Sequence, residues 1–75
     1  MRVLALGGSG GMGRFAVETS MQFENISKIF VADINADAAI AFSNTMNEKV
    51  SGFGLDVTDS DALRKAMEDK DIVIN

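Results

Sequence analysis

Five glycines stand within seven residues near the start of the chain, between an apolar run and a helical pattern. The run Arg2–Leu6 has the length of a strand, and from Met12 onward apolar positions recur at helical spacing. A backbone without side chains lets a diphosphate approach closely, and the free N–H groups of a helix's first turn attract an anion. Residues 8–13 fit G-x-G-x-x-G in the strand–turn–helix context that this motif requires. The stretch therefore predicts a loop that binds the phosphates of a dinucleotide.

The six residues of this loop are the candidate phosphate contacts. They are Gly8, Ser9, Gly10, Gly11, Met12 and Gly13. In this interpretation Gly8 permits the tight turn, Gly10 the close approach of the pyrophosphate, and Gly13 the packing of helix on strand. The surplus glycines also fit G-x-x-x-G-x-G and G-x-x-G-x-x-G, which are spacings of short-chain dehydrogenase type. The alternative for the glycine cluster is a structural turn that binds no ligand. The alternative for Met12 is a place in the hydrophobic core.

An acid ends the second apolar run, Lys28–Asp33, 20 residues after Gly13. At the carboxyl end of a strand such a carboxylate can accept hydrogen bonds from the ribose hydroxyls of adenosine. The negative charge of Asp33 would repel the additional phosphate of NADP. The next residue is Ile34, so no arginine stands there to neutralise that phosphate. The sequence therefore favours NAD and leaves NADP open, because Arg14 could reach a 2′-phosphate. The alternative for Asp33 is a strand-end acid that helps to cap the next helix.

Three further candidate contacts follow the third and fourth apolar runs. Asp56 would face the exocyclic amine of the adenine and Val57 the face of its ring. A turn acid and a core valine explain these two residues equally well. Asn75, after the run Ile72–Ile74, would point toward the nicotinamide ribose.

Apolar runs and helical patterns alternate along the chain. Strands are expected at residues 2–6, 28–33, 50–55 and 72–74, the third of them weakened by Gly52 and Gly54. Between the strands the pattern predicts three helices. The first has Met12, Ala16, Thr19 and Phe23 on one face. The second is capped by Asn35 and has Ala36, Ala39, Ile40, Ser43 and Met46 on or near one face. The third runs from about Ser60 to Asp69 and carries Ala62, Leu63, Ala66 and Met67.

This alternation predicts an α/β fold with parallel strands, right-handed crossovers and the strand order 3-2-1-4. In that order the first two helices cover one face of the sheet and the third begins to cover the other. The fourth strand is then left with apolar surface, although a parallel sheet needs both faces covered. We therefore expect residues 1–75 to be the N-terminal part of a nucleotide-binding domain, a truncated half of a doubly wound sheet.

Composition narrows the classes of function. The 75 residues carry a net charge of −4, which disfavours nonspecific nucleic-acid binding. The absence of cysteine excludes a thiolate metal site, and the absence of histidine and tyrosine removes two common general acids and bases. The acids near residues 59–61 and 68–71 fit helix starts and a solvated turn better than metal ligands. Without a signal-peptide pattern or a long apolar run, we expect a cytoplasmic protein with no membrane contact.

Four stretches of the chain resemble the N-terminal region of the saccharopine dehydrogenase-like family. They are Val3–Arg14, Val31–Asp33 with the Ala-rich helix after it, Leu55–Asp59 and Asp71–Asn75. The resemblance implies a Rossmann-type NAD(P)-binding region of an oxidoreductase that transfers a hydride at a C–N bond of an amino-acid adduct. It reaches the glycine loop, Asp33 and Asp56. The family's substrate domain and catalytic groups would lie outside this chain, so no catalytic residue is assigned.

Other families and functions stay open at this point. Short-chain dehydrogenases share the patterns of residues 56–58 and 71–75, but Leu6 stands where they usually carry Thr or Ser, and the third helix is short for them. A non-catalytic NAD(P)-sensing domain and a structural module without a ligand are the alternatives from other classes. The substrate would be bound by the missing part, so these residues alone are expected to be inactive. The sequence leaves a homodimer open.

Overall fold

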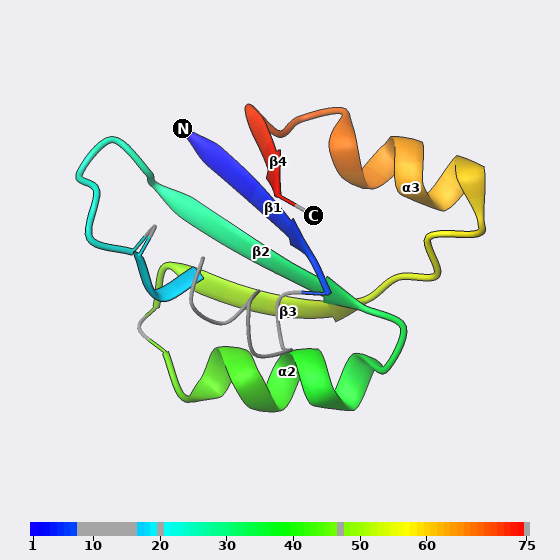
Figure 1. Ribbon diagram of the computed structural model, residues 1–75, viewed down its shortest axis with the longest axis horizontal. Helices are drawn as coiled ribbons and strands as arrows, with labels where there is room; N and C mark the ends of the chain where they lie inside the picture. Colours follow the sequence, from blue (N-terminus) through cyan, green and yellow to red (C-terminus); the bar gives the residue numbers. More distant parts are fainter. Residues whose placement is uncertain (8–16, 20, 47, 75) are drawn as a thin grey trace.

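In the part of the chain that the structure describes, four parallel strands form a sheet in the order β3-β2-β1-β4 (Figure 1). The computed structural model describes residues 1–7, 17–19, 21–46 and 48–74. The strands are β1 (Arg2–Leu6), β2 (Lys28–Asp33), β3 (Val50–Gly54) and β4 (Ile72–Ile74). The strand order predicted from the alternation of strands and helices is confirmed.

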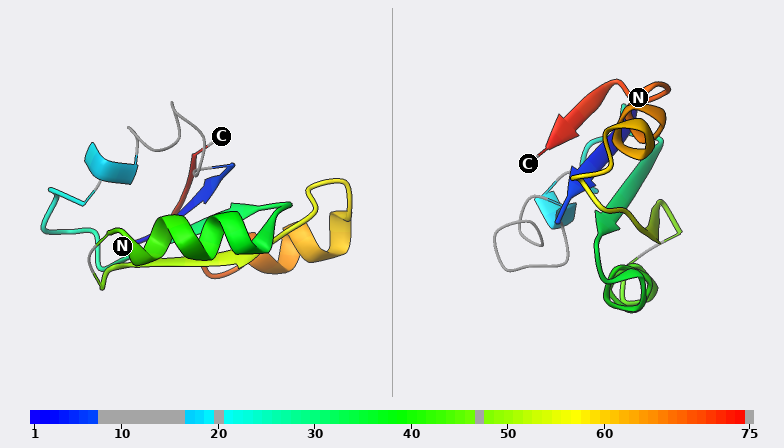
Figure 2. Two further views of the ribbon diagram at one scale, coloured as in Figure 1. Left: turned by 90° about the horizontal axis from the view of Figure 1, so that it is seen from below. Right: turned by 90° about the vertical axis from the view of Figure 1, so that its right-hand side faces the viewer.

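Parallel pairing brings the carboxyl ends of the strands to one edge of the sheet. β1 pairs with β2 as far as Leu6↔Ala32, and β2 pairs with β3 as far as Asp33↔Gly54. The segments that leave β1, β2 and β3 therefore start side by side (Figure 1). The turned views in Figure 2 show the strands fanned across one another, as in the twisted sheets of α/β proteins.

Two helices connect the later strands, and both begin at a capping side chain. Helix α2 (Ala36–Asn44) follows Asn35, whose side-chain oxygen accepts a hydrogen bond of 3.0 Å from the N–H of Ala38. Helix α3 (Ser60–Met67) follows Asp59, which accepts one of 3.2 Å from the N–H of Ala62. The predicted cap at Asn35 is confirmed. Residues 17–19 are also helical.

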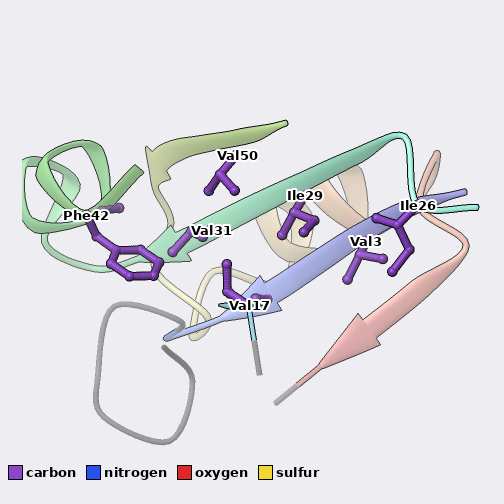
Figure 3. Close-up of a cluster of buried hydrophobic side chains, with 9 residues drawn as sticks. Val3, Val17, Ile26, Ile29, Val31, Phe42 and Val50 are labelled. Atoms are coloured by element: carbon purple, nitrogen blue, oxygen red, sulfur yellow. The ribbon is translucent and has the colours of Figure 1, made fainter. Parts of the chain in front are cut away.

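The described residues form one apolar cluster on each face of the sheet, because neighbouring residues of a strand point to opposite faces. The first cluster (Figure 3) comprises Val3, Ala5, Val17, Ile26, Ile29, Val31, Ala39, Phe42 and Val50. The second comprises Leu4, Ala32 and Leu55, against which Leu6, Phe30, Phe53, Ala62, Leu63 and Ala66 pack. Helix α2 thus covers one face and α3 the other, as the sequence predicted.

Helix α2 lies unusually close to β3, over two glycines. A Cβ atom at Gly52 would overlap the main-chain carbonyl of Ala39, and one at Gly54 would stand 2.8 Å from the Cβ of Ala36. These glycines do not simply weaken the strand, as the sequence suggested. They let the helix backbone rest directly on the sheet.

The buried faces of two helices differ from those predicted. In α2 the side chain of Ile40 is 45% exposed, whereas Phe42 is buried. The close contact at Ala39 explains this difference, because it turns Phe42 and Ser43, three and four positions on, toward the sheet.

The first helical pattern was also assigned to the wrong face in the part that the structure describes. Val17 is fully buried, while Thr19 and Phe23 are exposed. Residues two apart lie about 200° apart around a helix, so Val17 and Thr19 cannot share a face. Met12 and Ala16 lie outside the described residues.

The cap at Asn35 leads to a first prediction. Replacing Asn35 by alanine should lower the free energy of unfolding by about 1 kcal/mol, because the N–H of Ala38 loses its acceptor. Urea unfolding followed by circular dichroism measures the change. Asn44→Ala, at the exposed far end of the same helix, is the matched control and should change stability by less than about 0.5 kcal/mol. Equal losses in the two variants would contradict the capping role.

Candidate functional site

A cavity of about 360 Å³ opens at the carboxyl edge of the sheet. It is lined by the ends of β1 and β2 and by the segment that follows β3. The lining residues are Leu6, Gly7, Ala32, Asp33, Ile34, Leu55, Asp56, Val57 and Thr58. In open α/β sheets, ligands bind in the crevice outside the carboxyl ends of the strands. The cavity therefore occupies the expected place for a ligand, over the half of the sheet formed by β1, β2 and the end of β3.

Gly7 marks the point where the chain leaves β1 and begins the glycine-rich stretch. Its φ of 66° lies in the left-handed region, which glycine adopts without strain. Its N–H donates a hydrogen bond of 2.6 Å to the carbonyl of Ala32, and no described atom lies within 4 Å of where a Cβ would stand. Gly7 thus adopts a turn conformation at the end of β1, and the turn predicted at Gly8 lies outside the described residues.

Seven of the predicted contact residues lie outside the described residues. They are Gly8, Ser9, Gly10, Gly11, Met12, Gly13 and Asn75. The other three, Asp33, Asp56 and Val57, line the same cavity. Residues from the ends of two strands are therefore brought together as the sequence predicted, and their contact with a cofactor stays a prediction.

Asp33 ends β2 at the wall of the cavity and is partly exposed. One carboxylate oxygen, Oδ1, accepts a hydrogen bond of 3.0 Å from the N–H of Asn35. This bond supports the start of α2, which was the alternative role for the residue. The two roles are compatible, because an ionised carboxylate offers about four acceptor positions on its two oxygens.

Asp56 lies in the turn between β3 and α3, and Thr58 holds its carboxylate. The hydroxyl and the N–H of Thr58 donate hydrogen bonds of 2.6 and 2.9 Å, both to Oδ1 of Asp56. Both bonds lower the pKa of the Asp56 carboxyl below its usual value, and the bond from the hydroxyl has the larger effect. Asp56 is therefore a carboxylate at neutral pH and can accept hydrogen bonds from a ligand.

Two exposed apolar side chains belong to the rim of the cavity. Ile34 is 77% exposed and Val57 is 53% exposed, and they come from the segments after β2 and β3. The sequence pattern marked Ile34 only as the place where an arginine is missing, and it indicated no contact of Thr58 with the cofactor. The positions of Ile34 and Thr58 in the sequence could have indicated a place at the site, because residues just beyond the end of a parallel strand lie at the ligand-binding crevice.

The acids near the C-terminal end of α3 take part in structural contacts. Asp69 pairs with Arg2 at 3.1 Å and with Lys70, and the N–H of Arg2 donates to Asp71 at 2.7 Å. The ion pair and hydrogen bond with Lys70, followed by the charge of Arg2, lower the pKa of the Asp69 carboxyl. Lys70 and Arg2 also lie over the ring of Phe30. Within the described ranges, no three His, Cys, Asp or Glu residues are grouped as metal ligands would be.

Comparison with known proteins identifies the family. Residues 3–75 match the family model of the saccharopine dehydrogenase NADP-binding domain. The chain belongs to this family. The saccharopine dehydrogenase-like family inferred from the glycine loop and the strand ends is thereby confirmed, and NAD(P) is the cofactor of this saccharopine dehydrogenase-type domain.

Two similar proteins place this saccharopine dehydrogenase-type domain in context. It is 38% identical over 74 residues to a protein of Methanocaldococcus jannaschii named as an uncharacterized membrane protein. The matched region covers 97% of this chain and 22% of the relative. It is 18% identical, with a TM-score of 0.74, to the dTDP-glucose 4,6-dehydratase of Bacillus anthracis solved in complex with NAD, over 97% of this chain and 25% of that one. At this identity the second likeness supports the Rossmann-like fold alone.

The saccharopine dehydrogenase-type domain spans about a fifth of the length of its Methanocaldococcus relative. In the part of the domain that the structure describes, no helix combines the length and the apolar character needed to cross a bilayer.

Proposed function

We propose that this domain binds NAD with the adenosine half in the cavity at the carboxyl edge, as the cofactor-binding part of an oxidoreductase. The observation that carries the proposal is the meeting of Asp33 and Asp56 in one cavity beside the turn at Gly7. Both acids come from positions directly at or after a strand end, where a bound dinucleotide extends along the sheet edge.

The proposal gives each lining residue a separate task. Asp33 accepts hydrogen bonds from the ribose hydroxyls, and Asp56 accepts one from the amine of the adenine. Ile34 and Val57 offer apolar surface to the flat base, and their exposure leaves that surface open to it. The loop of residues 8–13 binds the pyrophosphate at the start of the first helix, and Asn75 contacts the nicotinamide ribose. The bound cofactor supplies the hydride chemistry.

The charges around the cavity favour NAD over NADP. Two of the nine described lining residues are acids, and none of these nine is lysine or arginine. A 2′-phosphate on the ribose would add negative charge next to Asp33. The family carries NADP in its name, so we propose that this chain differs from that name in its preferred cofactor.

The reaction we propose is hydride transfer at a C–N bond of an amino-acid adduct, with substrate and catalytic groups on other parts of the protein. The small share of the Methanocaldococcus relative that this domain spans supports this division. The apolar side chains of β4 support it as well, because Ile72 and Val73 are 41% and 37% exposed and would be covered by a neighbouring element.

Calorimetry of the full-length protein with NAD, NADH and NADPH tests the proposal. We expect binding of NAD and NADH, with NADPH weaker by about tenfold or more. A protein that binds none of the three would contradict the proposed function. A non-catalytic NAD sensor would also bind, so absorbance at the nicotinamide band must then be followed with saccharopine-type adducts. A substrate-dependent change supports the oxidoreductase, and its absence supports the sensor.

A further inference from the structure

We propose that Thr58 is a positioning residue that makes the site selective for adenine over other purines. It does so by fixing the carboxylate of Asp56 for the amine of the base. This inference rests on the proposed function, because it assumes that the adenosine half of NAD occupies the cavity.

The geometry around Asp56 is the basis of the inference. Both hydrogen bonds from Thr58, at 2.6 and 2.9 Å, go to the same oxygen, Oδ1. The second oxygen, Oδ2, has no hydrogen bond to any residue in the described ranges. Oδ1 is thus occupied by the protein, whereas Oδ2 keeps its acceptor capacity, and Asp56 itself lines the cavity.

Without Thr58 this carboxylate would have little to orient it. The side chain of Asp56 is exposed and lies in a turn. Among the described residues, only Thr58 donates hydrogen bonds to its carboxylate, one from the N–H and one from the hydroxyl. The turn itself is held independently, because the carbonyl of Asp56 accepts a hydrogen bond of 3.0 Å from the N–H of Asp59. Removing the hydroxyl of Thr58 leaves the carboxylate with the single bond from the N–H of residue 58, and should therefore loosen it while the turn persists.

An oriented carboxylate can distinguish the edges of purines. The exocyclic group at C6 of adenine is an amine and a donor, so it is attracted to a carboxylate oxygen. In hypoxanthine the same position carries a carbonyl oxygen, which is an acceptor and is repelled. A carboxylate held at that position therefore binds adenine better than hypoxanthine, because with hypoxanthine two acceptor oxygens face each other without a proton between them.

The test compares NAD with nicotinamide hypoxanthine dinucleotide, by calorimetry on the full-length protein. We expect the unmodified protein to prefer NAD by about tenfold, and Thr58→Val to reduce this preference about fivefold by weakening NAD alone. Thr58→Ser keeps the hydroxyl and should keep the preference. Asp56→Ala should abolish it, and adding Thr58→Val to Asp56→Ala should then change nothing further, as expected for residues that act as a unit.

The possible failures can be told apart. If the unmodified protein binds no NAD, the proposed function itself fails. If it binds NAD without preference over the hypoxanthine analogue, or if Thr58→Val leaves the preference unchanged, the role of Thr58 is overturned and the cofactor assignment stands. If Thr58→Val weakens both dinucleotides equally, or still weakens NAD in the Asp56→Ala background, Thr58 acts only on the structure of the turn and the inference is also overturned.

Discussion

Replacing Asp33 by asparagine is expected to lower the preference for NAD over NADP by on the order of 100-fold. The ribose hydroxyls lose a charged acceptor and keep a neutral one, which weakens NAD by about 1 kcal/mol. The 2′-phosphate of NADP loses a repulsive partner, and for a half-exposed carboxylate this is worth about 1–2 kcal/mol, well below the value for a sheltered pair. Calorimetric affinities for NAD and NADP give the ratio directly.

Asparagine is chosen because it should leave the structure unchanged, so that the affinity ratio reports only the change at the cofactor site. Its side-chain oxygen can still accept the hydrogen bond from the N–H of Asn35, so the start of α2 should be unchanged. Asp37→Asn is the matched control, because it removes the same charge from an exposed residue four positions on that does not line the cavity. It should leave the cofactor ratio within about twofold. Equal shifts in both variants would mean that net charge, and not contact with the ribose, sets the preference.

The location of Asp33 illustrates what the sequence could predict. Alternating strands and helices allow few topologies once crossovers are right-handed, so the strand order and the shared carboxyl edge followed from the pattern. Asp33 and Asp56 each stand at a strand end in the sequence, and a parallel sheet necessarily brings such residues together. The helix cap at Asn35 followed from residue type and position alone.

What the sequence could not predict depends on distances between elements. The buried face of α2 is set by how deeply the helix rests on β3, so Phe42 faces the core in place of Ile40. The role of Thr58 depends on the side-chain rotamers within one turn, which no spacing rule specifies. Gly52 shows the same limit, because the pattern of a strand counts a glycine only as a weak position.

Replacing Gly52 by alanine should be among the most destabilising single changes in the domain. The new methyl group would overlap the main-chain carbonyl of Ala39, which is fully buried and cannot rotate away as a side chain can. Overpacking of this kind costs about 1–3 kcal/mol, and a contact with backbone belongs at the upper end. A loss of about 3 kcal/mol would lower the melting temperature of a domain of this size by about 12–24 °C. Thermal unfolding measures it.

Gly54 provides the control that tests the mechanism, because its close neighbour is a side chain. A Cβ at Gly54 would stand 2.8 Å from the Cβ of Ala36, so Gly54→Ala should also destabilise the domain. Adding Ala36→Gly removes that Cβ and should recover at least half of the lost stability, although glycine at the start of α2 itself costs up to about 1 kcal/mol. Ala39→Gly should give no such recovery for Gly52→Ala, because the clash there is with a carbonyl that every residue carries. Recovery in both pairs, or in neither, would refute the view that α2 rests on β3 through direct backbone contact at Gly52.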